Sequence, residues 1–138
     1  MESASSTSIL VVEDNADDSF MLTRQLQKAQ IDDHATVIEN GEAALNFLLK
    51  AERPPLAIFL DLRLPGLSGI ELLKRVKQDS RLQSIPVIIM TGSTDPKHLD
   101  ECTRLGATAF LEKPVALTTF IKTVAHLFPR TADQASKG

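Results

Sequence analysis

The sequence contains a single cysteine, Cys102, among its 138 residues. A disulfide needs two cysteines, so none can form within the chain, and a reducing compartment is indicated. No apolar run approaches the ~20 residues that a membrane-spanning helix requires. The first residues, MESASSTS, lack the basic segment and the long apolar core of a secretory signal. We therefore expect a cytoplasmic protein with no membrane contact.

Clusters of basic residues are also missing. The chain has 15 lysines and arginines against 18 acidic residues, and its formal net charge is −3. Because nucleic-acid binding depends on a basic surface, this balance argues against DNA or RNA as the main partner. The residues that are present, 43% hydrophobic and 24% charged, are typical of one globular domain.

Five short apolar runs predict buried β-strands, because they are rich in Ile, Val and Leu and mostly continuous rather than alternating. The runs are Ile9–Val12, Ala35–Ile38, Leu56–Leu60, Val87–Met90 and Ala109–Leu111. Amphipathic segments between and after them predict five helices. We therefore expect an α/β domain over residues 9–128, a five-stranded parallel sheet flanked by five helices. The polar tails, residues 1–8 and 129–138, are expected to be mobile.

Several residues mark where the helices begin and end. The first helix is predicted over residues 17–29, Asn40 caps the second, Pro96 opens the fourth and Gly106 ends it. The fourth helix has a sparse apolar face of Leu99, Cys102 and Leu105. The predicted apolar faces of the first and last helices are Phe20, Met21 and Leu26, and Leu117, Phe120, Ile121, Val124 and Phe128.

Polar residues stand where the predicted strands end. In chain order they are Glu13, Asp14, Asp61, Thr91 and Lys113. In a parallel sheet these strand ends share one rim, which is where ligands bind in such folds. Three clustered carboxylates repel one another, and a hard cation such as Mg²⁺ offsets that repulsion. A carboxylate can accept a phosphoryl group, which Asp61 would do while Lys113 and Thr91 bind phosphoryl oxygens.

Other polar residues have ordinary interpretations. Asp17 and Asp18 are interpreted as a solvated first helical turn, and Cys102 as a small apolar residue. The three histidines, His34, His98 and His126, have no metal-ligand spacing and are interpreted as surface or structural residues.

Four segments together resemble a known family. VVEDN at 11–15, FLDLRLPGLSG at 59–69, MTGS at 90–93 and FLEKP at 110–114 resemble the receiver domain of bacterial two-component response regulators. The similarity extends from about Ile9 to Phe128. It implies a flavodoxin-like, CheY-like fold with strand order 2-1-3-4-5.

The resemblance also implies roles for individual residues. Asp61 matches the residue that is phosphorylated by a phosphohistidine donor. Asp14 matches a direct Mg²⁺ ligand, Glu13 an assisting one, and the main-chain carbonyl of Arg63 completes the set. Thr91 and Phe110 match a switch pair, Lys113 matches the phosphate-binding lysine, and the bond before Pro114 is often cis in this family.

Two positions depart from the usual pattern. The family's commonest switch aromatic is tyrosine, and this chain has none, so Phe110 would have to act through packing alone. Arg63 is large and charged at a position that is often smaller or polar. With Ser93, it is expected to affect phosphate lifetime in a direction that the sequence does not decide.

The function that this pattern predicts is a single-domain response regulator, not an enzyme. Its predicted partners are a sensor histidine kinase or a histidine phosphotransfer protein, and a downstream protein target. About ten residues follow the last helix, so the output is expected to be a protein contact. One form of that contact is a homodimer through the fourth helix, fifth strand and fifth helix. The segments DNADDS and ENGEAALNFL favour a regulator of the phytochrome-associated type.

Two alternatives remain open at this stage. One is a binding module with the same fold that acts without phosphorylation. The other is a phosphatase of the haloacid dehalogenase type, which needs a second acid two residues after the nucleophile. Arg63 occupies that position, and this argues against the phosphatase.

Overall fold

The computed structural model describes residues 9–28, 35–64, 67–92 and 96–127. The strands are β1 (Ile9–Val12), β2 (Ala35–Ile38), β3 (Ala57–Asp61), β4 (Val87–Thr91) and β5 (Ala109–Glu112). The helices are α1 (Ala16–Lys28), α2 (Gly41–Lys50), α3 (Gly69–Gln78), α4 (Pro96–Leu105) and α5 (Leu117–Leu127). The predicted tails lie outside the described residues, as do Ala29, His34, Pro65, Gly66, Ser93 and Phe128.

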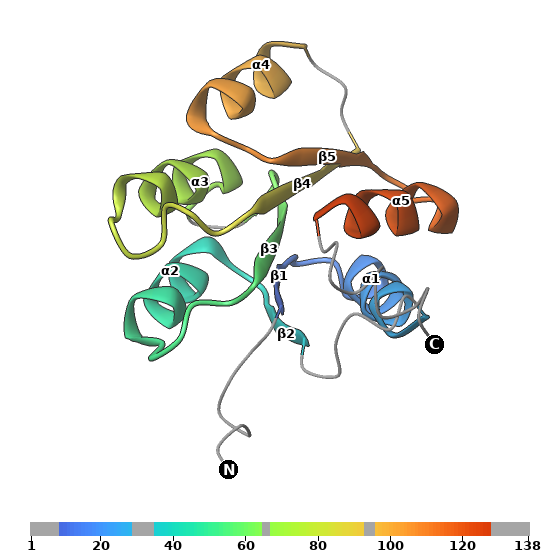
Figure 1. Ribbon diagram of the computed structural model, residues 1–138, viewed down its shortest axis with the longest axis horizontal. Helices are drawn as coiled ribbons and strands as arrows, with labels where there is room; N and C mark the ends of the chain where they lie inside the picture. Colours follow the sequence, from blue (N-terminus) through green and yellow to red (C-terminus); the bar gives the residue numbers. More distant parts are fainter. Residues whose placement is uncertain (1–8, 29–34, 65–66, 93–95, 128–138) are drawn as a thin grey trace.

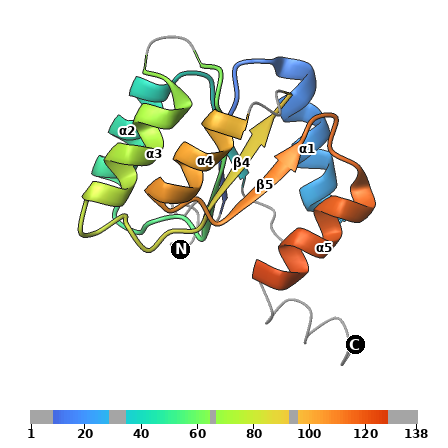
Figure 2. The same ribbon diagram turned by 90° about the horizontal axis from the view of Figure 1, so that it is seen from above.

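The strands form one parallel sheet in the order β2-β1-β3-β4-β5, which confirms the predicted fold class. Helices α2, α3 and α4 cover one face, and α1 and α5 cover the other (Figures 1 and 2). None of the helices that the structure describes is long and apolar enough to cross a membrane.

Alternate residues of the central strands enter two separate cores. Leu10 and Val12 of β1 pack toward α2, α3 and α4, whereas Ile9 and Val11 pack toward α1 and α5. Side chains of a strand point alternately to its two faces, so a strand covered on both faces must be apolar throughout. This accounts for the continuous apolar runs of β1, β3 and β4, which are buried along their whole length.

The two edge strands differ from the prediction that all five are fully buried. Residues of β2 and β5 are mostly half-buried, and Val37 in β2 is exposed. The prediction was wrong for these strands because each has a neighbouring strand on one side only. The predicted start of β3 was also wrong, because Leu56 precedes the strand and is half exposed.

Two helix ends follow the predicted local chemistry. The side chain of Asn40 accepts a hydrogen bond from the N–H of Ala43, so it caps α2 as expected. Gly106 has a φ of 105°, a left-handed conformation that glycine adopts without strain, and it ends α4.

The predicted apolar faces of α1 and α5 needed correction. In α1, Phe20 and Met21 are exposed, and Leu22 joins Leu26 in the core instead. In α5 the buried residues are Phe120 and Val124, whereas Leu117 and Ile121, which were predicted on the same apolar face, are more than a third exposed. The physical reason is that a run of adjacent apolar residues does not specify which of them faces the sheet.

Candidate functional site

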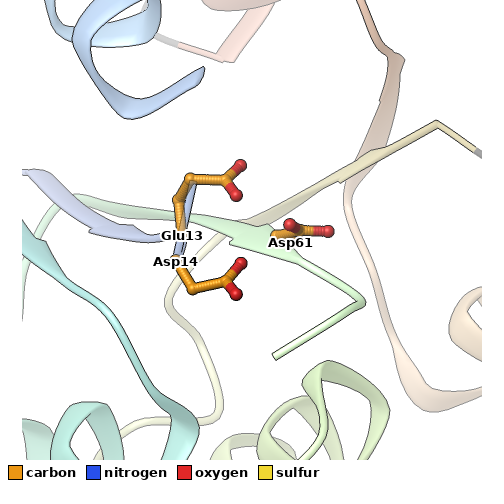
Figure 3. Close-up of side chains that lie close together, drawn as sticks. All are labelled: Glu13, Asp14 and Asp61. Atoms are coloured by element: carbon orange, nitrogen blue, oxygen red, sulfur yellow. The ribbon is translucent and has the colours of Figure 1, made fainter. Parts of the chain in front are cut away.

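Three carboxylates meet at the carboxyl end of the sheet. Glu13 and Asp14 follow β1, and Asp61 is the last residue of the adjacent strand β3. One oxygen of each carboxylate lies within 4.8 Å of the others. Figure 3 shows the side chains of Glu13 and Asp14 directed toward Asp61. Glu13 and Asp61 are buried, whereas Asp14 is exposed, so the cluster opens to solvent on one side.

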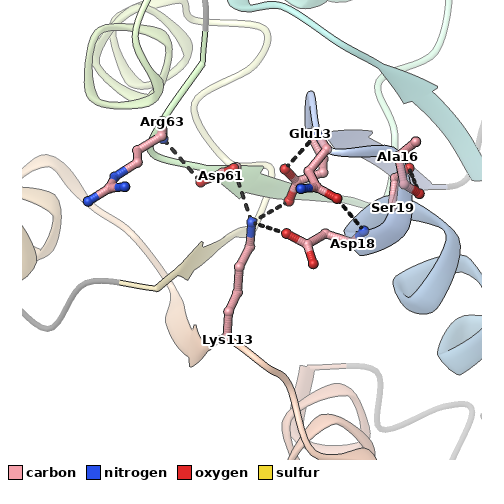
Figure 4. Close-up of polar contacts among 8 residues, drawn as sticks. Glu13, Ala16, Asp18, Ser19, Asp61, Arg63 and Lys113 are labelled. Carbon is pink, nitrogen blue, oxygen red and sulfur yellow. Dashed lines mark hydrogen bonds and ion pairs between the residues drawn. The ribbon is translucent and has the colours of Figure 1, made fainter.

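Lys113 reaches into this cluster from the segment after β5 (Figure 4). Its Nζ lies 2.6 Å from Glu13 Oε1 and 3.1 Å from Asp61 Oδ2. It also lies 3.0 Å from Oδ2 of Asp18, in the first turn of α1. One ammonium therefore offsets part of the charge of three carboxylates. The peptide bond between Lys113 and Pro114 is cis, as the family resemblance implied.

The loop after β3 holds the other oxygen of Asp61. Oδ1 accepts a hydrogen bond of 3.0 Å from the main-chain N–H of Arg63. The Arg63 side chain is exposed and points away from the carboxylates (Figure 4). Both Asp61 oxygens therefore have a donor, one from the loop and one from Lys113.

Two glycines allow this loop to pack tightly. A Cβ on Gly69 would lie 2.5 Å from the carbonyl oxygen of Asp61, and a Cβ on Gly41 would lie 2.1 Å from that of Leu67. The N–H of Gly69 also donates to the carbonyl of Leu62 at 3.2 Å. Because these approaches leave no room for a side chain, glycine at 41 and 69 lets the loop fold back beside Asp61.

The site changes the protonation of its own groups. Burial, together with the nearby Asp61 carboxylate, raises the pKa of Glu13 to about 7, although Lys113 and the N–H of Asn15 act in the opposite direction. Burial alone would lower the pKa of Lys113, but its hydrogen bonds to Glu13, Asp18 and Asp61 outweigh burial and raise it. Lys113 is therefore a fixed positive charge at neutral pH.

Thr91 and Phe110 lie on the neighbouring strands β4 and β5. Thr91 ends β4, where it is buried, and its carbonyl accepts a hydrogen bond of 2.8 Å from the N–H of Lys113. Phe110 lies in β5, opposite Ile89 in the strand register. It is half-buried and packs against the core beneath α2, α3 and α4.

The fold thus brings together Glu13, Asp14, Asp61 and Lys113 from positions far apart in the sequence. Sequence reasoning missed Asp18, which was interpreted as solvated although it contacts Lys113 from 95 positions away. No local pattern distinguishes it from its acidic neighbours. His98 and His126 are exposed, and Cys102 is buried in the core, in agreement with their ordinary interpretations.

The carboxylates suit a hard divalent cation. Oε1 of Glu13 is buried, and it forms an ion pair of 2.6 Å with the Lys113 ammonium. A carboxylate oxygen has more than one lone pair, so an ion pair leaves coordination capacity unused, and oxygen ligands with an open side are what Mg²⁺ prefers. The residues present therefore fit a cation held by Glu13, Asp14 and Asp61.

Comparisons with known proteins agree with this geometry. The sequence pattern of the response regulator receiver domain matches residues 9–125. The two-component response regulator ARR8 of Arabidopsis thaliana is 32% identical over 92% of this chain, and the chain spans 63% of that protein's length. The bacteriophytochrome response regulator RtBRR has a TM-score of 0.78 and 32% identity, with 86% of this chain and 76% of that one covered. The Mn(2+)-bound form of response regulator Rcp1 has a TM-score of 0.75 and 30% identity, with coverage of 89% and 92%.

Proposed function

The chain belongs to the family of response regulator receiver domains, and we propose that it accepts a phosphoryl group on Asp61 from a phosphohistidine. The donor is a sensor histidine kinase or a histidine phosphotransfer protein, and the product signals to a protein target. The observation that carries this proposal is the position of Asp61, a buried carboxylate at a strand end, between Lys113 and the Glu13–Asp14 pair.

The reaction replaces a P–N bond by a P–O bond. A carboxylate oxygen of Asp61 attacks the phosphorus, and the bond to the donor's imidazole breaks. The electron pair goes to the imidazole nitrogen, which takes up a proton. Phosphoryl transfer depends mainly on positioning and on positive charge around the phosphoryl oxygens. Glu13, Asp14, Asp61 and the carbonyl of Arg63 would hold a divalent cation, Mg²⁺ in the cell, which when bound neutralises charge on the incoming group.

The chain's own residues do the rest. Lys113 exchanges its contact with Asp61 Oδ2 for one with a phosphoryl oxygen, and stays charged because its pKa is raised. The Thr91 hydroxyl donates to a second phosphoryl oxygen. The N–H of Arg63 holds Asp61 Oδ1 and so orients the carboxylate. The Mn(2+)-bound form of the related Rcp1 supports the assignment of a divalent cation.

Phosphorylation adds about −1.5 to −2 charge at the rim, and we propose that Thr91 and Phe110 respond to it. Thr91 moves toward the phosphoryl group, and the half-buried Phe110 fills the space that it leaves, through packing alone. Helix α4 suits such a change, because Cys102 is its one buried residue among those described. A shift of the population from 1:99 to 99:1 requires about 5.5 kcal/mol.

The proposal also covers where the protein acts and which proteins it contacts. We expect a cytoplasmic signalling protein that works without enzymatic turnover, in agreement with the family. Its target binds, or a second copy pairs, at the face of α4, β5 and α5. The similarity to RtBRR favours a sensor kinase of the bacteriophytochrome type. Arg63 holds Asp61 Oδ1 through its main-chain N–H, and we propose that this residue affects how long the phosphate lasts.

A small-molecule donor tests the acceptor role without a partner. The chain is incubated with acetyl phosphate and Mg²⁺, and its intact mass is measured against an Asp61→Asn variant. We expect one phosphoryl group on the wild type, none on the variant, and none after chelation of the metal. An unmodified wild type, or equal labelling of Asp61→Asn, contradicts the proposal. Repeated turnover of p-nitrophenyl phosphate would favour the phosphatase alternative instead.

A further inference from the structure

Helix α1 holds the segment that carries Lys113 at two points. Asp18 Oδ2 lies 3.0 Å from Lys113 Nζ, in the cluster drawn in Figure 4. About two turns further along the same helical face, the buried side chain of Gln25 donates a hydrogen bond of 2.8 Å to the carbonyl of Val115. The segment after β5 is therefore attached to α1 both through the lysine side chain and through the main chain just beyond it.

The carboxylate of Asp18 stands on a rigid support. Its own N–H donates to Oδ1 of Asn15 at 3.0 Å, and the next N–H, of Ser19, donates to the carbonyl of Asn15 at 3.0 Å. The N–H of Asn15 donates to Oε2 of Glu13 at 3.1 Å. Asn15 thus connects the first turn of α1 to the end of β1. Because aspartate has a short side chain, a fixed main chain leaves its carboxylate little freedom.

The three carboxylates around Lys113 differ in what else they do. Under the proposed function, Glu13 contributes to a cation site and Asp61 is converted to an acyl phosphate. Both change their charge environment during the reaction. Asp18 belongs to neither role, so its contact with Lys113 can persist while the other two change.

From these contacts we infer that Asp18 is a positioning residue, which holds the Lys113 ammonium within reach of the phosphoryl group on Asp61. It acts through Lys113 and does not touch the reacting atoms. This inference rests on the proposed function. An ammonium on a long, flexible side chain has many rotamers, and a fixed acceptor beside the site reduces the entropy lost when it binds a phosphoryl oxygen.

Asp17 offers a matched control within the same helical turn. It is exposed, carries the same charge and has the same favourable position at the start of α1. The salt bridges of Lys113 among the described residues are with Glu13, Asp18 and Asp61. Replacement of Asp17 by alanine therefore removes a charge near the site without removing a contact of Lys113.

The test measures the initial rate of labelling by acetyl phosphate and Mg²⁺ for the wild type and for Asp18→Ala, Asp18→Asn and Asp17→Ala. A small donor is used so that docking of a protein partner does not enter the rate. We expect Asp18→Ala to label about fivefold more slowly. This factor corresponds to the loss of one charge-assisted contact, reduced because the Asp18 side chain is partly exposed to solvent. Asp18→Asn keeps an oxygen acceptor of the same shape, so it should stay within about twofold of wild type, as should Asp17→Ala.

A second measurement asks whether Asp18 acts through Lys113. Urea unfolding is followed for Asp18→Ala, Lys113→Ala and the double variant. We expect Asp18→Ala to destabilise the wild type but not the Lys113→Ala background, where the lysine is absent and only repulsion between carboxylates remains. These curves also show whether each variant is folded.

The outcomes separate this inference from the proposed function. Labelling of Asp18→Ala at the wild-type rate overturns the inference alone, as does an equal loss in Asp17→Ala, which would show an effect of charge without position. An Asp18→Asn rate as low as that of Asp18→Ala also overturns it. A wild type that takes no label overturns both.

Discussion

The loop that presents Asp61 should not tolerate a single added methyl group at Gly69. A Cβ there would lie 2.5 Å from the Asp61 carbonyl oxygen and 2.6 Å from the Leu62 Cα. Both separations are well inside the about 3.5–4 Å of a favourable contact. The atoms it would meet belong to the main chain, so they cannot move aside as a side chain would. Gly69→Ala must therefore shift the end of β3 or the start of α3.

The size of the effect follows from two opposing contributions. Overpacking of this kind costs about 1–3 kcal/mol, and alanine regains up to about 1 kcal/mol through its higher helix propensity. We expect a net loss of about 1–2 kcal/mol, which for a domain of this size lowers the melting temperature by about 3–8 °C. Because the clash involves Asp61 itself, labelling by acetyl phosphate should slow as well.

Gly92→Ala is the matched control. Gly92 follows Thr91 at the same rim, and a Cβ on it would meet nothing within 4 Å. Circular dichroism melting curves and initial labelling rates are compared for the two variants and the wild type. If Gly69→Ala melts and labels like Gly92→Ala, then the close approach at Asp61 does not constrain the loop, and the reasoning is refuted.

Three further predictions concern the carboxylate cluster, the core and a helix end. The pKa of Glu13 is raised from 4.5 to about 7, so between these pH values the folded, metal-free protein keeps a proton that the unfolded chain has lost. The free energy of unfolding should therefore fall as the pH rises through about 7. The affinity for Mg²⁺ should fall as the pH drops below about 7, because a protonated Glu13 is a poorer ligand. Titration calorimetry against pH, with Glu13→Gln as control, checks this, and a flat affinity between about pH 6 and 8 would contradict it. Phe120 is buried and stacks on Phe59 with ring centroids 5.7 Å apart. Phe120→Ala should therefore lower the free energy of unfolding in urea by about 3–5 kcal/mol, whereas Ile121→Ala, at an exposed position, should lower it little. Gly106→Ala should lower the free energy of unfolding by about 1 kcal/mol, because the φ of 105° at this position is strained for alanine. An unchanged urea midpoint would argue against that conformation in solution.

Much of the fold could be predicted because its signals are local. Continuous apolar runs identified β1 and β4 to within a residue, since strands covered on both faces bury every side chain. Asn40 and Gly106 marked helix ends through contacts with their nearest neighbours in sequence. The rotation of α1 could not be predicted in this way. Phe20, Met21 and Leu22 are adjacent, and the packing of the whole helix on the sheet decides that only Leu22 is buried.

The candidate site shows the same division. The residue types at the strand ends, and their order along the chain, were sufficient to predict that Asp61, the Glu13–Asp14 pair and Lys113 would meet, because parallel strands end at one rim. The partner that prediction missed was Asp18. Its sequence context is that of a solvated helical turn, and only the placement of α1 beside the segment after β5 brings it to 3.0 Å from the lysine.

By itself, then, the sequence determined which chemical groups the rim would contain, since the ends of the strands are encoded in local patterns of polarity. The tertiary structure alone decided how those groups share their charges: Glu13 and Asp61 are buried beside the Lys113 ammonium, and Asp18 contacts the same ammonium from helix α1. The physical reason is that burial and distance between segments about 95 positions apart are properties of packing, and electrostatic energies depend on both.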